Sequence, residues 1–273
     1  MLPSADFHLH THHSGDSPAP MGDLVNRAVE LGLSDICFTD HLDLDYPQYD
    51  DLPEGAFDLD FKAYHDEVSF FQDKFKDRIN IGYGVEIGMQ PQVAKENSEI
   101  VKRENFDFVI ASIHLIDQKD PYYPEFWPGH DPSDVLRHYF EITLENLLLF
   151  DDYDVLGHID YLVRYVPKGT EYSYAKYSDV IDAILLHIIK KDKGLDFNSK
   201  AVSKPAYGGN PNPHPDVLKR YKELGGRIIT FGSDAHTPDA IAGSFDKMRD
   251  IAISCGFNEY CTFSGRTPAF HKL

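Results

Sequence analysis

Residues 228–236 read Ile228-Ile229-Thr230-Phe231-Gly232-Ser233-Asp234-Ala235-His236, a mostly apolar run that ends in two metal-ligating side chains. A run with no polar alternation is typical of a strand buried on both faces, as in parallel sheets. Seven runs of this kind occur along the chain, at residues 7–10, 35–39, 80–86, 106–114, 153–158, 194–198 and 227–233. They predict a sheet of buried parallel strands.

Amphipathic stretches with helical periodicity separate these runs. They cover residues 21–31, 60–76, 91–103, 132–150, 175–193, 213–224 and 238–254, and Pro91, Pro132 and Pro238 stand where a first helical turn tolerates proline. Sevenfold strand–helix alternation predicts an α/β fold. The 273 residues suit one barrel domain over 1–273. An open doubly wound sheet is the alternative, although no Gly-x-Gly-x-x-Gly follows the first strand.

Six of the seven apolar runs end in His, Asp or Glu. Parallel strands of a barrel present their carboxyl ends on one face, so these side chains are expected to converge. Imidazoles and carboxylates are ligands for Zn²⁺, Mn²⁺ or Fe²⁺. His8 and His10 are two residues apart on a strand and therefore point to the same side. Each such residue alone is equally compatible with a hydrogen-bonded loop side chain, but together they favour a metal centre.

The formal net charge of −19 argues against nucleic acid or an anionic membrane as the main partner. The three cysteines, Cys37, Cys255 and Cys261, have no metal-ligand spacing and are expected to be reduced thiols. Residues 1–6 lack the features of a signal peptide, and no apolar run reaches about 18 residues. These features lead us to expect a cytoplasmic protein.

The strand-end motifs resemble the polymerase-and-histidinol-phosphatase (PHP) family, and they occur in the family's order along nearly the whole chain. They are His8-Leu9-His10-Thr11, Thr39-Asp40-His41, Gly84-Val85-Glu86, Ile113-His114, Gly157-His158 and Ser233-Asp234-Ala235-His236. Residues 155–165 are similar to the histidinol-phosphate phosphatase branch. The resemblance implies a distorted (β/α)₇ barrel, TIM-like, with its active site at the carboxyl ends of the strands.

The resemblance also implies a centre of three divalent metal ions, Zn, Mn or Fe. One ion is assigned to His8, His10, Glu86 and Asp234, a second to Glu86, His114 and His158, and a third to Asp16, His41 and His236. His13 is an alternative to Asp16, because loop geometry cannot be read from spacing.

The implied reaction is the hydrolysis of a small phosphate monoester, L-histidinol phosphate, to L-histidinol and phosphate in histidine biosynthesis. We expect in-line attack by a metal-bridging hydroxide without a phosphoenzyme. The expected catalytic residues are Glu86, Asp234 and His236, and either of the last two is a candidate to protonate the leaving group.

Three further side chains are expected to contact the substrate. Arg164 follows the fifth strand, and its guanidinium suits paired hydrogen bonds to phosphate oxygens. Lys204 is a second phosphate ligand, and His130 lies in a loop that could reach the substrate. The aromatic segment 118–129 is expected to form a wall or lid.

Other functions fit parts of the pattern. A phosphatase of phosphotyrosine, nucleotides or nucleic acid would use the same chemistry, although a nucleic-acid enzyme should show a basic track. A non-catalytic metal-binding module would retain the ligands alone. An amidohydrolase also begins with His-x-His, but it usually uses a lysine where this chain has Glu86 and His114. The native metal and the oligomeric state are left open.

Overall fold

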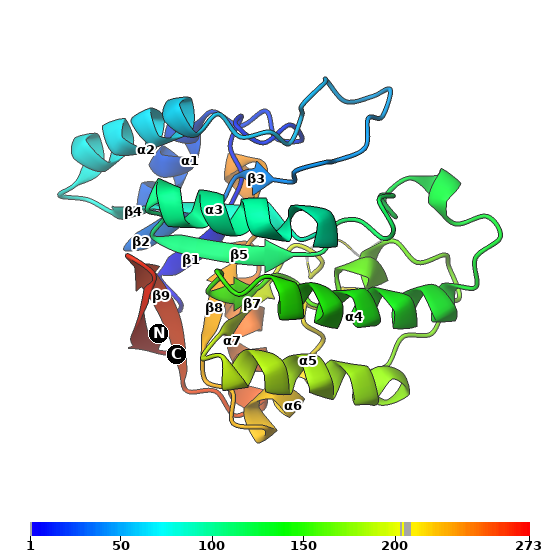
Figure 1. The fold of residues 1–273 in the computed structure, drawn as a ribbon. Coiled ribbons are helices and arrows are strands. Elements are labelled where there is room, and N and C mark those ends of the chain that lie inside the picture. The colour runs from blue at the N-terminus through cyan, green and yellow to red at the C-terminus, as the bar shows by residue number, and fades with distance from the viewer. Residues whose placement is uncertain (1, 203, 205–208) are drawn as a thin grey trace.

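Seven parallel strands form a sheet that is nearly closed into a barrel, with helices around it (Figure 1). The computed structural model describes residues 2–202, 204 and 209–273. The barrel strands are β1 (Ala5–Leu9), β2 (Asp35–Phe38), β4 (Asn80–Gly88), β5 (Phe108–Ser112), β6 (Val155–Leu156), β7 (Gly194–Asn198) and β8 (Ile229–Gly232). Each pairs with the next in this order, which confirms the predicted α/β barrel.

The first and last strands meet at the closing edge of the barrel. Leu9 pairs in parallel with Ala235, and the backbone N–H of Asp234 donates to the carbonyl oxygen of His8 over 2.8 Å. A two-residue strand, β3 (His41–Leu42), pairs with β4 and places His41 opposite Glu86. This register brings residues from both ends of the chain to the same mouth of the barrel.

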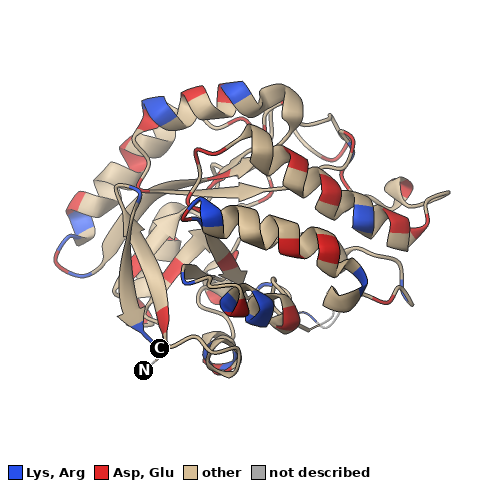
Figure 2. Cartoon of the chain, turned by 60° about the horizontal axis from the view of Figure 1, so that its bottom comes forward, with Lys and Arg blue, Asp and Glu red and all other residues tan. Residues whose placement is uncertain are grey.

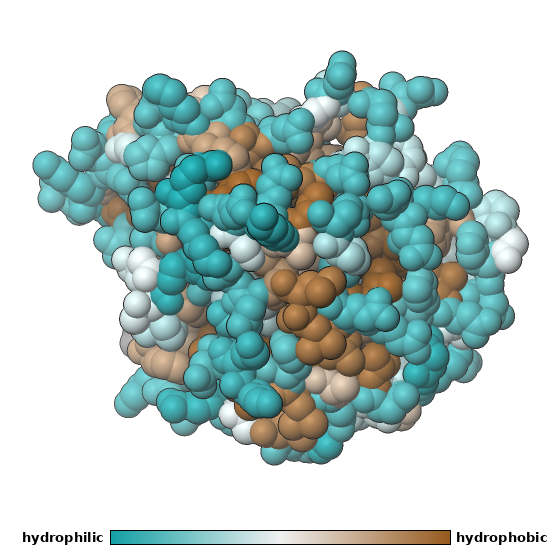
Figure 3. Space-filling model, in the orientation of Figure 1, coloured by the Kyte–Doolittle hydropathy of each residue, from teal (hydrophilic) through white to brown (hydrophobic). Residues whose placement is uncertain are grey.

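The helices bury their apolar faces against the outside of the sheet. They are α1 (Met21–Glu30), α2 (Phe61–Phe75), α3 (Ala94–Glu104), α4 (Pro132–Leu149), α5 (Ser178–Lys190), α6 (Pro215–Glu223) and α7 (Phe245–Ser254). In α5, Ile181, Ile184 and Ile188 are buried at helical spacing. The face in Figure 3 is mostly hydrophilic, with an apolar patch over α4 and α5. These two helices carry exposed leucines, Leu148, Leu149 and Leu186.

Some predicted boundaries are wrong for local reasons. The expected helix at 238–254 is a 3₁₀ turn, η6 (Pro238–Ala240), followed by α7, because Ala242 and Ser244 between them adopt positive φ. The expected helix at 175–193 contains a 3₁₀ turn, η4 (Tyr174–Tyr177), before α5. Strand β6 has two residues instead of six, and the Asp154 carboxylate before it accepts the backbone N–H of Val109 over 2.8 Å. A side chain thus replaces part of the expected ladder.

A C-terminal hairpin, β9 (Glu259–Ser264) and β10 (Thr267–Lys272), was not predicted. Its side chains pack on the end of the barrel where the strands begin. Phe263 contacts Phe108, the first residue of β5, at 4.9 Å between ring centroids, and the Tyr260 hydroxyl accepts the backbone N–H of Ser4, just before β1, over 3.2 Å. In Figure 1 the hairpin lies at the end of the barrel where β1 begins. It therefore covers the mouth opposite to the strand ends that carry the polar motifs.

Charged residues are dispersed over the described part of the chain. Figure 2 shows Lys and Arg scattered among acidic residues on the helices, without a continuous basic track in that view. None of the described helices combines the length and the apolar character needed to span a lipid bilayer.

Gly84 lies where neighbouring strands leave no room for a side chain. An added Cβ would lie 2.8 Å from the carbonyl oxygen of Phe38 and 2.9 Å from that of Phe108. Backbone atoms of a closed barrel cannot move aside as a flexible side chain can. We therefore expect Gly84→Ala to lower the free energy of unfolding by about 1–3 kcal/mol. Urea denaturation followed by circular dichroism measures the change, and an unchanged midpoint would contradict this packing.

Candidate metal centre

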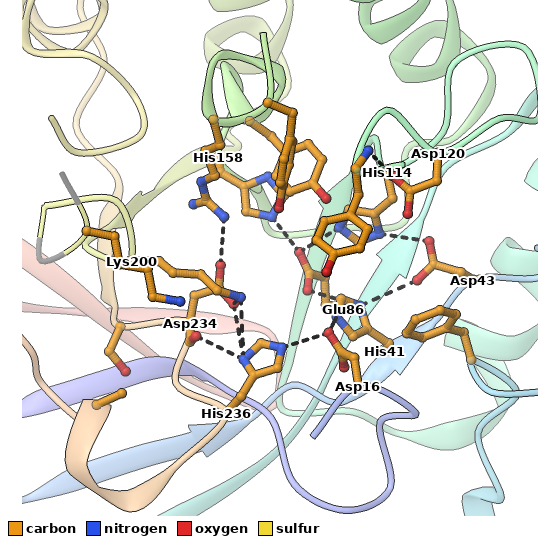
Figure 4. A pocket seen from close by; sticks show the side chains of 18 of the residues that line it. Asp16, His41, Asp43, Glu86, His114, Asp120, His158, Lys200, Asp234 and His236 are labelled. Atoms are coloured by element: carbon orange, nitrogen blue, oxygen red, sulfur yellow. Dashed lines mark hydrogen bonds and ion pairs between the residues drawn. The ribbon is translucent and has the colours of Figure 1, made fainter. Parts of the chain in front are cut away.

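A buried carboxylate, that of Glu86, lies at the centre of a cluster of imidazoles at the carboxyl ends of the strands (Figure 4). Its two oxygens lie 2.9–3.3 Å from a ring nitrogen of each of five histidines: His8, His10, His41, His114 and His158. The Ser112 hydroxyl donates to Oε1 over 2.6 Å and fixes the carboxylate. The structure thus brings these predicted side chains together.

The remaining predicted ligands lie beside this group. Asp234 Oδ1 is 3.6 Å from His10 Nε2 and 3.6 Å from His236 Nδ1. Asp16 Oδ2 is 2.9 Å from His236 Nε2 and 3.7 Å from His41 Nε2. All nine side chains predicted as ligands therefore meet at one mouth of the barrel.

His13, the alternative to Asp16, points elsewhere. Its Nε2 lies 2.8 Å from Glu67 Oε2 on helix α2. Of the two residues that the sequence offered for the position beside His41 and His236, Asp16 is therefore the one that lies in the cluster.

The donor atoms suit divalent cations. Four triads have their donor atoms within 4.8 Å of one another: His8–His10–Glu86, His41–Glu86–His114, His10–His41–His236 and His8–His158–Asp234. His10 Nε2 is buried and has no hydrogen-bond partner among the described residues, although it faces the carboxylates of Glu86 and Asp234. An unsatisfied buried atom is costly, and a cation shared by these three residues would satisfy it. The cluster therefore has the donor atoms and the spacing that a metal-binding site requires.

Two further carboxylates, which the sequence analysis missed, orient the histidines. Asp196 Oδ2 lies 2.8 Å from His8 Nδ1, and Asp43 Oδ1 lies 2.7 Å from His114 Nδ1. Such contacts fix the ring that a metal would bind and raise its basicity. The available signal for Asp196 was an acidic residue inside an otherwise buried strand, Gly194–Asn198.

The surroundings raise the pKa of some of these imidazoles and lower the pKa of others. Burial lowers the pKa of His8 and His114, but the carboxylates of Glu86 and of Asp196 or Asp43 outweigh burial and raise both well above the usual value. For His158, burial dominates and lowers the pKa to about 4. The raised histidines are protonated at neutral pH, whereas His158 is already neutral.

The cluster opens into a cavity of about 580 Å³. His8 and His10 are fully buried, whereas the other seven predicted ligands line the cavity. Arg164, from the 3₁₀ turn η3 (Tyr161–Arg164), is buried in its wall and donates to Asn212, Asp234 and Asn198 over 2.8–3.1 Å. A guanidinium has five N–H donors, so three bonds leave capacity for an anion.

Two lysines from one loop also line the cavity. Lys204, predicted from the sequence, lies at its exposed rim. Lys200, which was not predicted, is closer to the cluster: its Nζ is 2.8 Å from Asp234 Oδ1 and 3.5 Å from His236 Nδ1. Spacing alone could not choose between two lysines in the same loop.

His130 does not line this cavity, which contradicts its predicted contact with substrate. Its ring stacks on Phe126 with centroids 5.3 Å apart, and it borders a separate cavity together with Asp131 and His138.

The wall opposite the lysines is aromatic and acidic. The segment 118–129 contributes Asp120, Tyr122 and Tyr123, and the loop after β3 contributes Tyr46. The Tyr46 hydroxyl donates to Asp120 Oδ2 over 2.5 Å. This segment thus forms part of the cavity wall.

The chain belongs to the PHP domain family, which its sequence matches over residues 6–200. Among curated relatives, the histidinol-phosphatase of Lactococcus lactis subsp. lactis is 33% identical over 262 residues, which cover 95% of this chain and 94% of the relative.

Two solved structures are similar. The L. lactis histidinol phosphate phosphatase, complexed with zinc, L-histidinol and phosphate, has a TM-score of 0.89 and 32% identity, and covers 98% of this chain and 100% of its own. A putative histidinol phosphatase from Listeria monocytogenes, with a TM-score of 0.77, 18% identity and coverage of 89% and 99%, shares the fold.

Metal binding should release protons. At pH 7 the imidazoles of His8 and His114 carry protons on the ring nitrogens that face Glu86, since both pKa values are raised, and a metal ion must displace these protons. Affinity should therefore increase as pH rises toward these pKa values and fall in acid. Calorimetric titration of metal-free protein with Zn²⁺ in buffers of different ionisation enthalpy measures the release. An apparent enthalpy that is the same in all buffers would contradict the assignment.

Proposed function

We propose that this protein is a metal-dependent phosphomonoesterase that hydrolyses L-histidinol phosphate to L-histidinol and phosphate, as part of histidine biosynthesis. The observation that carries the proposal is a cluster of nine imidazole and carboxylate side chains, seven of them buried, next to two cationic side chains, Arg164 and Lys200, in one cavity. The similarity to histidinol-phosphatases over nearly the whole chain supports the substrate.

Three divalent ions, Zn, Mn or Fe, would be held by the predicted sets. His8, His10, Glu86 and Asp234 form the first, and Glu86 joins His114 and His158 in the second. Asp16, His41 and His236 form the third. The proximity of Glu86 to five imidazoles supports its place in both the first and the second set. When bound, such ions lower the pKa of water and withdraw charge from phosphoryl oxygens.

The chain's own residues would position the phosphate and move the proton. Arg164 and Lys200 offer cationic donors on the cavity wall, and Lys204 adds a third at the rim. Burial raises the pKa of Asp234, but Lys200, His8 and Arg164 outweigh burial and hold it well below its usual value. Its carboxylate is therefore ionised and a weak base, and once it has taken a proton from the attacking water it would be a strong acid toward the leaving oxygen. His236 is the alternative proton donor.

The acidic, aromatic wall would select the organic part of the substrate. Histidinol carries an ammonium group and an imidazole, both suited to carboxylates and tyrosine rings. Asp120 lies in the wall with only 7% of its surface exposed. We assign its carboxylate to the ammonium group.

Other phosphoesters are the second choice. A nucleic-acid substrate is disfavoured by the net charge of −19 and by the dispersed cations in the described part of the chain (Figure 2). A nucleotide, or a phosphotyrosine residue within a protein, lacks the ammonium group that the acidic wall would bind. A cytoplasmic location agrees with three cysteines that are all unpaired and buried.

A kinetic panel on the metal-loaded enzyme tests the proposal. Histidinol phosphate should exceed p-nitrophenyl phosphate and phosphotyrosine in kcat/KM by roughly 100-fold. Chelation should abolish phosphate release, and Zn²⁺, Mn²⁺ or Fe²⁺ should restore it. Activity that survives removal of the metal would reject the metallophosphatase, and equal turnover of all esters would reject only the substrate.

Asp120→Asn tests the assigned contact with the ammonium group. We expect KM for histidinol phosphate to rise about 10-fold or more, because a charge-assisted hydrogen bond contributes about 1.5–3 kcal/mol. Hydrolysis of p-nitrophenyl phosphate should stay unchanged, since that ester has no ammonium group. Asp117→Asn is the matched control, because Asp117 pairs with His138 beside the other cavity. An equal loss with both esters would exclude this role.

A further inference from the structure

A second group of metal-ligating side chains lies apart from the cavity. His12 and His13 follow β1, and Glu67 projects from α2 (Phe61–Phe75). Glu67 Oε2 lies 3.4 Å from His12 Nε2 and 2.8 Å from His13 Nε2. The two imidazole rings lie side by side, with centroids 4.5 Å apart. Two ring nitrogens therefore converge on one carboxylate oxygen.

The geometry is close to that of a metal site. A tetrahedral zinc ion with bonds of about 2.0–2.1 Å holds its ligand atoms about 3.3 Å apart. The separation between His12 and Glu67 already matches, and that between His13 and Glu67 needs to widen by about half an ångström. The side chain of His12 is 46% exposed and that of His13 is 11% exposed. The group thus opens to solvent on one side, where water can complete the coordination.

We propose that His12, His13 and Glu67 bind one divalent transition-metal ion, with Zn²⁺ the best fit, at a site separate from the central cluster. Two histidines and one carboxylate form a ligand set that such ions accept. The strong negative charge of the protein favours cations at its surface.

The ion would connect two elements that are distant in sequence. The loop after β1 carries Asp16 and also Ser14, whose hydroxyl donates to Asp40 over 2.7 Å. A metal bound to His12 and His13 would attach this loop to α2 through Glu67. The outer site would therefore stabilise the segment that presents Asp16 to the central cluster.

Zinc stoichiometry tests the site. Wild-type protein and Glu67→Gln are dialysed to equilibrium against the same micromolar free Zn²⁺, and bound metal is measured by mass spectrometry. We expect the wild type to hold one more zinc ion per chain than Glu67→Gln. His12→Ala/His13→Ala should lose the same ion. Because the result is a difference, it does not depend on how many ions the central cluster takes.

Asp66→Asn is the matched control, since Asp66 is the preceding residue of α2 and pairs with Lys62. It should keep the wild-type stoichiometry, and circular dichroism should show that all variants are folded. In hydrogen exchange, added zinc should slow residues 11–17 more in the wild type than in Glu67→Gln, because only the wild type has the outer site. Equal zinc contents in wild type and Glu67→Gln would overturn the proposal, and the contacts of Glu67 with His12 and His13 would then be ion pairs without a metal.

Discussion

The ionised carboxylate of Glu86, buried at the mouth of the barrel, is the constraint on which the structure depends. A buried charge is costly unless it is paired and hydrogen-bonded. Here the imidazoles of His8, His114 and His158 and the Ser112 hydroxyl hydrogen-bond the carboxylate, and the rings of His10 and His41 lie 3.3 Å from it. Two of those imidazoles are in turn held by Asp43 and Asp196. A barrel of parallel strands supplies these groups because all of its strand ends reach the same face.

The strands of the sheet are buried on both faces and therefore appear in the sequence as apolar runs. This explains why much of the arrangement could be predicted. Residues 228–236 show a buried strand and its polar end in one stretch, and β8 (Ile229–Gly232) lies inside it. Similarly, Pro132 marks the first residue of α4, where Asp131 caps the helix. Short-range pattern and strand-end position therefore sufficed to find the buried parallel strands and to bring the candidate ligands to one place, whereas the choice of a barrel over an open sheet rested on the family resemblance.

What could not be predicted depends on contacts between distant segments. His13 pairs with Glu67 on α2, and Asp16 pairs with His236. The spacing of residues in the loop carries no information about either partner. Loop spacing also could not show that Lys200 lies closer to the cluster than Lys204 does, or that His130 stacks on Phe126. The C-terminal hairpin was missed because its apolar residues are buried only by contact with the end of the barrel, where Phe263 contacts Phe108.

The cavity joins two parts of different origin. Its charged floor comes from strand ends that the barrel holds rigidly, whereas its acidic, aromatic wall comes from the loops that carry Tyr46 and Asp120. Loops tolerate insertion and replacement far better than barrel strands do. Evolution could therefore exchange the molecule that is recognised while inheriting the reactive centre unchanged, and a protein engineer could graft new loops onto the same strands.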